Sequence, residues 1–147
     1  MTDEEFEGFL VGCSDDQVNS LRGLRSLIDQ NSAGLDEGVN TGRWLNGYVF
    51  YSAHGQMIYA IGPKGKSKTT LHMMPYYGSP VLQERHGEAL STFLSGKSCI
   101  AFHGYSELPL DALTDIICRG TQVMIRMLEE LARAERARRS THPKEPD

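Results

Sequence analysis

The stretch that decides the fold runs from residue 94 to residue 117 and reads LSGKSCIAFHGYSELPLDALTDII. Its first part predicts a helix that ends at Gly96, followed by a short strand over 98–102. A turn then leads to a helix that begins at Pro109, a residue suited to the first helical turn because the N–H it lacks would have no partner there. Asp111 follows, where a carboxylate complements the positive end of the helix dipole.

Helices are also predicted on both sides of the central part of the chain. Ser14 begins a capping box in front of apolar residues at helical spacing, which predicts an amphipathic helix over 15–30. The final helix, from Pro109, carries a similar apolar stripe, and we expect it to continue past the domain as far as His142. Gly120 within it costs about 1 kcal/mol relative to alanine, which predicts a bend or the close approach of another helix.

Between these helices, short runs of aromatic and β-branched residues alternate with glycine-containing turns. The connection over 35–42 leads to runs that we interpret as strands, at 43–45, 48–52, 57–61 and 69–74. Asn46-Gly47 is a strong turn signal between the first two runs. Short strands joined in this way favour an antiparallel meander. The expected fold class is therefore α+β, a mostly antiparallel sheet of about four to six strands packed by N-terminal and C-terminal helices.

The composition of the 147-residue chain excludes several classes of protein. Hydrophobic residues make up 39% and charged residues 23%, as in ordinary globular domains. No apolar run reaches the ~20 residues needed to span a bilayer, so we expect no membrane partner. The net charge of −4 argues against a nucleic-acid partner. The acidic N-terminus differs from a secretory signal, and the three separate cysteines favour reduced thiols, so we expect a cytoplasmic location.

The sequence shows no motif for a cofactor, a metal or a catalytic centre. The lysine-rich run over 62–69 lacks the spacing of a phosphate loop. No serine lies in a GxSxG elbow. Five histidines are scattered without metal-binding spacing: His54, His72, His86, His103 and His142. We therefore assign no cofactor, no metal ligand and no catalytic residue from the sequence.

Aromatic and polar residues at strand ends form the candidate ligand site. Its members are Arg43, Trp44, His72, Tyr76, Tyr77 and His103. Strand ends and the loops that follow them often line ligand sites. His72 and His103 each lie in or at the end of a strand, so we consider a cleft that both histidines face. The competing interpretation is that Trp44 and the tyrosines cap the core, with buried rings and wet tips.

Several of these features together resemble the YdhG-like domain family (domain of unknown function 1801). Members end in a Gly-Lys-x-x-Ile-x-Phe strand, a short turn and a Leu-Pro helix, which correspond here to Gly96, Lys97, Ile100, Phe102, Leu108 and Pro109. The opening helix and the segment NTGRWLNGYVFYSAHGQMIYAIGP also resemble the family, although residues 40–44 lack the Met-Pro that many members carry there. The resemblance implies an α+β fold and divides the chain into an acidic lead-in (1–13), a YdhG-like domain (14–120), and a helical extension with a charged tail (121–147).

Three functions from different classes remain open. The first is a non-catalytic small-molecule-binding or accessory module with a site near Trp44, His72 and Tyr76. The second is iron handling, which the resemblance implies because one bacterial branch of the family is regarded as a frataxin-like iron chaperone. The third is an enzyme of unrecognised type that uses His72 or His103 as acid or base. The missing triad, metal motif and nucleotide loop favour the first function, and the C-terminal helix offers a surface for a homodimer.

Overall fold

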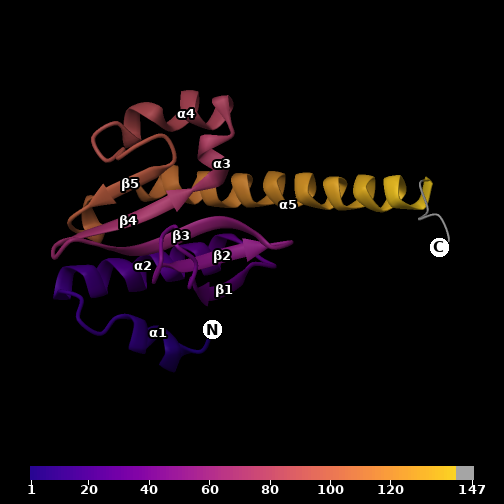
Figure 1. The fold of residues 1–147 in the computed structure, drawn as a ribbon. Helices are drawn as coiled ribbons and strands as arrows, with labels where there is room; N and C mark the ends of the chain where they lie inside the picture. The colour runs from indigo at the N-terminus through magenta and orange to yellow at the C-terminus, as the bar shows by residue number, and fades with distance from the viewer. Residues whose placement is uncertain (142–147) are drawn as a thin grey trace.

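The computed structural model describes residues 1–141, and the charged tail over 142–147 lies outside the described residues (Figure 1). The elements follow in the order α1 (Asp3–Phe9), α2 (Asp15–Asn31), β1 (Asp36–Val39), β2 (Val49–Ala53), β3 (Gln56–Lys64), β4 (Lys68–Met73), α3 (Met74–Tyr77), α4 (Pro80–Leu90), β5 (Cys99–Phe102), a 3-10 turn (Tyr105–Glu107) and α5 (Leu110–Thr141). This α+β fold, with helices flanking one antiparallel sheet, confirms the expected fold class.

The sheet is an antiparallel meander with the strand order β1-β2-β3-β4-β5. Leu71 of β4 lies opposite both Ile61 of β3 and Ile100 of β5, and all three side chains are fully buried. A bulge in β3 leaves Ile58 without a partner in β2, and both Ile58 and its neighbour Tyr59 are fully buried. The sheet therefore has one strongly apolar face.

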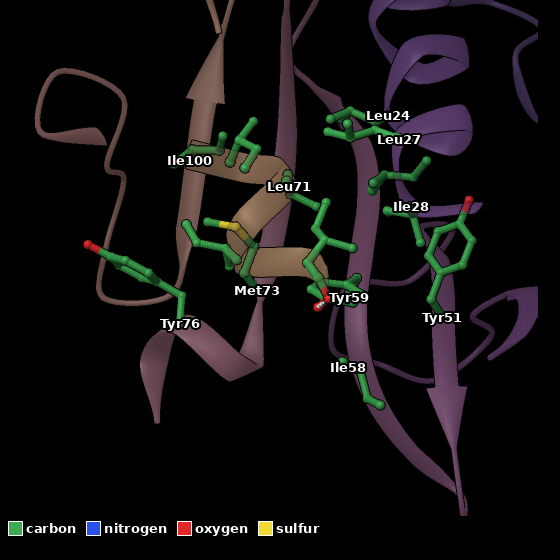
Figure 2. Packing of buried hydrophobic residues seen from close by; sticks show 14 of the residues in the cluster. Leu24, Leu27, Ile28, Tyr51, Ile58, Tyr59, Leu71, Met73, Tyr76 and Ile100 are labelled. Carbon is green, nitrogen blue, oxygen red and sulfur yellow. Dashed lines mark hydrogen bonds between the residues drawn. The ribbon is translucent and has the colours of Figure 1, made fainter. Parts of the chain in front are cut away.

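That apolar face packs against α2 and α5 and forms the hydrophobic core. The buried residues of the two helices include Leu21, Leu24, Ile28, Leu113, Ile116 and Ile117. Figure 2 shows side chains of α2 gathered with Tyr51, Tyr59, Leu71 and Ile100 from four successive strands. Full burial of a leucine or isoleucine side chain stabilises a fold by about 1.5–3 kcal/mol, so this layer is the main source of stability.

Local signals begin the two core helices as the sequence predicts. The Ser14 hydroxyl accepts a hydrogen bond from the backbone N–H of Gln17, whose side chain accepts one from the backbone of Ser14. This capping box satisfies two helix-end donors and fixes the start of α2. At α5, the Pro109 carbonyl accepts from the N–H of Leu113. The predicted helix over 15–30 and the helix that begins at Pro109 are both confirmed.

Gly120 marks a close approach between α5 and the short helix α3. A Cβ atom at this position would lie 2.5 Å from the Cβ of Pro75, so only glycine fits without a shift. Beside it, the Tyr59 hydroxyl lies 3.1 Å from the Ile117 carbonyl and 2.8 Å from the Thr121 hydroxyl. Beyond Thr121 no residue of α5 is buried, and Figure 1 shows the helix projecting well past the sheet.

Three local predictions from the sequence were wrong. Residues 36–39, expected within a connection, form the edge strand β1. The segment has no apolar alternation that would predict a strand, and its pairing with β2 holds it in the sheet. Residues 43–45 lie in the β1–β2 loop instead of a strand. The helix expected to end at Gly96 ends at Leu90, and Gly96, with a φ of 111°, lies in the turn before β5.

Candidate functional site

The face of the sheet opposite the core, here called the outer face, carries the candidate site. Pairing places His72 beside Ala60 and Cys99, and places Thr70 beside Gly62. Side chains alternate along a strand, so these residues share the face that points away from α2 and α5. The small side chains in β3 leave room there for larger groups from outside the sheet.

The loop between β1 and β2 supplies those larger groups. The Asn40 side chain accepts a hydrogen bond from the Gly42 N–H and donates to the Trp44 carbonyl at 2.6 Å. Asn46 donates to the carbonyls of Thr41 and Gly42 at 3.0 Å each. These bonds give the loop a defined shape without secondary structure. They hold the Trp44 backbone in place, so the indole is presented to the sheet at little entropic cost.

Four aromatic rings meet on the outer face. Trp44 is edge-on to His72 and to Phe50, with ring centroids 5.9 Å and 6.4 Å apart. Tyr48 approaches His72 in the same manner at 6.0 Å. Edge-to-face pairs of this kind are worth about 0.5–1.5 kcal/mol beyond their area. Even so, 58% of Trp44 is exposed, so the interpretation that Trp44 caps the core does not hold for this ring.

Tyr48 is fixed against β3 by a glycine. A Cβ at Gly62 would lie 2.6 Å from the Tyr48 ring, so the ring rests directly on the Gly62 backbone. The Tyr48 hydroxyl also donates to the Pro63 carbonyl at 3.3 Å. Tyr48 is therefore a rigid wall of the site, next to His72.

His72 is half-buried and lies close to a lysine. Burial lowers the pKa of His72, and the positive charge of Lys64 lowers it further. His72 is consequently neutral at pH 7. Its ring packs edge-on against Trp44 and Tyr48, and neither ring nitrogen hydrogen-bonds to another of residues 1–141. The Lys64 ammonium donates to the Ser95 hydroxyl at 2.9 Å, which extends the lysine across the sheet. The site thus offers one unpaired neutral imidazole with Lys64 near it, and Lys68, opposite Lys64 in the register, adds a second exposed cation at this end of the outer face.

Two further polar groups lie on this face. The hydroxyl of Thr70 is buried and has no hydrogen-bond partner within the described chain. The Cys99 thiol donates to the Ser95 carbonyl at 2.6 Å, and burial raises the pKa of Cys99 against the opposing effect of Lys64. A thiol held protonated in this way is a poor nucleophile.

The other residues predicted for the site lie elsewhere. Arg43 is exposed in the loop beside Trp44. Tyr76 is buried near α4, and Tyr77 is half-exposed over a groove between α3 and α5. His103 follows β5 and is four residues along from Cys99, the partner of His72, or about 13 Å. The predicted cleft shared by His72 and His103 is therefore wrong, and so is the grouping of Tyr76 with Trp44.

A second polar cluster lines a groove of about 830 Å³ at the N-terminal side of the sheet. Arg25 donates two hydrogen bonds to Glu37 at 3.0 Å, and the Tyr51 hydroxyl donates to the same carboxylate at 2.7 Å. Arg25 also pairs with Asp3 and stacks over the ring of Phe6 at 4.4 Å. Arg25, Glu37 and Asp3 are paired with one another, so the cluster attaches α1 and β1 to the core. Asp29 and Asp36 also line the groove and form no ion pair within residues 1–141.

A third cluster joins α4 to α5. His86 Nε2 lies 2.6 Å from Asp115 Oδ2, and Arg119 donates to the other oxygen of Asp115. The hydrogen bond from His86, followed by that from Arg119, lowers the pKa of Asp115. These contacts hold the two helices together and present no nucleophile.

Among residues 1–141, a metal centre and a membrane span are the two remaining kinds of site to consider. No group of three or more histidine, cysteine or acidic side chains there is arranged to hold a metal ion. No helix in this range is long and apolar enough to cross a membrane.

Reasoning from sequence missed Lys64, Tyr48 and Thr70 as members of the site. Lys64 belongs to the lysine-rich run over 62–69, which lacks the spacing of a phosphate loop, and it lies in β3 and extends toward Ser95. The available signal was the spacing of two residues between Lys64 and Gly62, which places both on the same face of a strand. The structure therefore defines an α+β protein with an aromatic and cationic surface on the open face of its sheet. Comparison with protein-family models, curated proteins and solved structures found no match for the chain.

Proposed function

We propose that the protein is a non-catalytic binding module that takes a small planar molecule with one anionic group on the outer face. The observation that carries this proposal is the exposed Trp44 ring held edge-on to the unpaired imidazole of His72. A large exposed aromatic on a pinned loop favours stacking with a planar ligand. We expect the affinity to come mainly from this contact.

The polar groups around Trp44 indicate the charge of the ligand. The Lys64 ammonium attracts an anion, while the neutral imidazole of His72 supplies a hydrogen bond without a second charge. No acidic residue is among the outer-face residues of β3, β4 and β5 that pair around His72. An aromatic carboxylate matches this arrangement better than a neutral or cationic aromatic molecule does.

Binding fits the site better than catalysis does. A general base is normally oriented by a second group, and within residues 1–141 no side chain hydrogen-bonds to His72, whose ring packs edge-on against Trp44 and Tyr48. The nearby thiol of Cys99 is held protonated. For these reasons, an enzymatic function that uses His72 or His103 is a weaker proposal than binding.

We also keep membership of the YdhG-like family as a proposal. It is supported by the strand, short turn and helix that the segment from Gly96 to Pro109 forms before α5. Iron handling would follow from that family alone, and the described residues offer it no preformed ligand cluster. A cytoplasmic location is supported by three free cysteines, and the absence of a nucleic-acid partner by the net charge of −4.

A thermal-shift screen tests the proposed binding function. Benzoate-type acids and their uncharged amides would be compared at equal concentration against the wild-type protein. We expect the acids alone to raise the melting temperature, since a ligand at 100 times its Kd stabilises by about 2.7 kcal/mol. Trp44→Ala and Lys64→Met should each abolish the response. Lys66→Met, an exposed lysine at the β3–β4 turn, is the matched control and should retain it. A response that survives Trp44→Ala would exclude this surface.

A further inference from the structure

Beyond Thr121, α5 leaves the core: Met124, Ile125 and Leu128 are partly buried against it, and no apolar residue from 129 to 141 packs on it. The last buried residue is Thr121, and α5 continues to Thr141, about 30 Å further at 1.5 Å per residue. In proteins most helical stability comes from packing of an apolar face. The projecting turns nevertheless carry apolar side chains, with Val123 63%, Met127 45% and Leu131 59% exposed. These residues recur every four positions and form one stripe along the helix.

A groove lies beside the start of this stripe. It has a volume of about 610 Å³ and runs between α5 and the pair α3 and α4. Its walls include Pro75, Tyr77 and Val81 on one side and Val123 and Met127 on the other. Tyr77 is 50% exposed and Val81 67% exposed, so the groove and the stripe form one continuous apolar surface. Exposed surfaces of this kind mark sites of association.

The charges beside the stripe indicate which partner covers it. Arg126 and Glu130 lie next to Met127 and Leu131, and neither forms an ion pair within residues 1–141. Within one helix, an arginine four residues before a glutamate is the less favourable order. In two antiparallel copies centred on Met127, Arg126 of each helix lies within one turn of Glu130 of the other. Val123 of each copy then lies opposite Leu131 of the other.

We propose that α5 pairs antiparallel with α5 of a second copy of this chain, with Met127 at the two-fold axis. The projecting turns of each copy then run along the groove of the other, whose rim carries Arg119 and Arg126. Because the two-fold axis repeats every contact, the dimer contains the Val123–Leu131 contact twice and the Arg126–Glu130 pair twice. Flanking pairs of opposite charge are the usual device that sets helix orientation in such dimers.

Light scattering coupled to size-exclusion chromatography tests this pairing with two charge reversals. The monomer has a mass of 16.4 kDa, and we expect the wild type to elute with twice that mass at micromolar concentrations. Arg126→Glu and Glu130→Arg should each weaken the dimer at least tenfold, because each places like charges opposite one another. Mixing the two single variants should restore a dimer, since the mixed pair carries opposite charges at both contacts.

The mixing experiment separates the proposed contact from effects within one helix. Glu129→Arg makes the same charge change about 100° around the helix and is the matched control, which should remain dimeric. Leu131→Glu removes the apolar contact and should give a folded monomer, because Leu131 makes no core contact. A wild type that stays monomeric at several hundred micromolar would overturn the proposal. So would a dimer that both charge reversals leave unchanged, or single variants that fail to associate when mixed.

Discussion

Trp44 lies edge-on to His72 at a centroid distance of 5.9 Å, although the first residue belongs to a loop and the second to the interior strand β4. The contact depends on the asparagine bonds within the β1–β2 loop and on the small residues of β3 beneath it. It places an exposed indole next to a neutral imidazole. The proposed binding function rests on this contact.

The protonation of His72 should be visible in the fluorescence of Trp44, the only tryptophan. Burial and Lys64 lower the pKa of His72, so its protonation, and the quenching of the indole by the imidazolium, should occur below the ordinary value of 6.5. Lys64→Met should move the midpoint upward, because a repelling charge is removed. A fluorescence titration of both proteins checks this, and His72→Gln should lose the transition. An identical midpoint with and without Lys64 would show that the lysine does not act on His72.

The lowered pKa of His72 also predicts how the stability of the protein depends on pH. The unfolded state binds its proton near pH 6.5, before the folded state does. The stability that neutral His72 contributes is therefore fully present above pH 6.5 and is lost as the pH falls through the lower folded pKa. Urea unfolding of the wild type and His72→Gln between pH 7.5 and pH 5 measures the difference. If the variant lost stability just as steeply over this interval, His72 would not be the group responsible.

Gly62 should be intolerant of a side chain because Tyr48 rests on it. Gly62→Ala should destabilise the protein by about 1–3 kcal/mol, as the ring must move to admit the new methyl group. Gly38→Ala is the matched control, since Gly38 also lies in a strand but its Cβ would meet nothing within 4 Å. Urea denaturation measures both changes. Equal effects at the two glycines would mean that Tyr48 does not pack as described.

The buried hydroxyl of Tyr59 should contribute to the joint between β3 and α5. Tyr59→Phe removes the bonds to the Ile117 carbonyl and the Thr121 hydroxyl, and leaves Thr121 buried without a partner. We expect a loss of about 1–3 kcal/mol in the free energy of unfolding. Thr121→Val should cost less in the Tyr59→Phe background than in the wild type. Strictly additive losses in this double-mutant cycle would indicate that the two hydroxyls do not interact.

The Arg25–Glu37–Tyr51 cluster should make stability depend on pH in the acidic range. Burial alone would raise the pKa of Glu37, but the hydrogen bonds from Arg25 and Tyr51 outweigh it and lower the pKa. The stability from this carboxylate is present above its ordinary value of 4.5 and is lost as the pH falls through the folded pKa. Glu37→Gln should flatten the stability profile between pH 5 and pH 2, whereas Glu4→Gln, at an exposed position of α1, should not. Parallel profiles for the wild type and Glu37→Gln would contradict the assignment.

The sequence predicted those elements whose signals are local. The capping box at Ser14, the proline before α5 and the alternating runs of β2 to β4 each act within a few residues, so α2, α5 and the meander were expected. The strand β1 was missed because its residues are polar and pairing with β2 holds it in place. Non-local pairing leaves no periodic pattern in such a short edge strand.

The site was predicted only in part for the same reason. Trp44 and His72 were expected to share a surface and do so, but Lys64 joins them only through the register of β3 and β4. His103 was expected beside His72, yet the antiparallel register places it at the far end of β5. Sequence spacing alone does not reveal which end of a neighbouring strand a residue will reach.

Backbone amide chemical shifts of the 15N-labelled protein, followed during titration with benzoate, show whether the outer face binds an aromatic carboxylate. We expect the amides that shift to belong to the outer face and its loop, around Trp44, Tyr48, Lys64 and His72. Benzamide should produce no comparable shifts, and Trp44→Ala should remove those seen with benzoate, while Lys66→Met should leave them unchanged. The proposed function would be contradicted if no amide shifted at millimolar benzoate. It would also be contradicted if the shifting amides surrounded Arg25 and the N-terminal groove instead of Trp44.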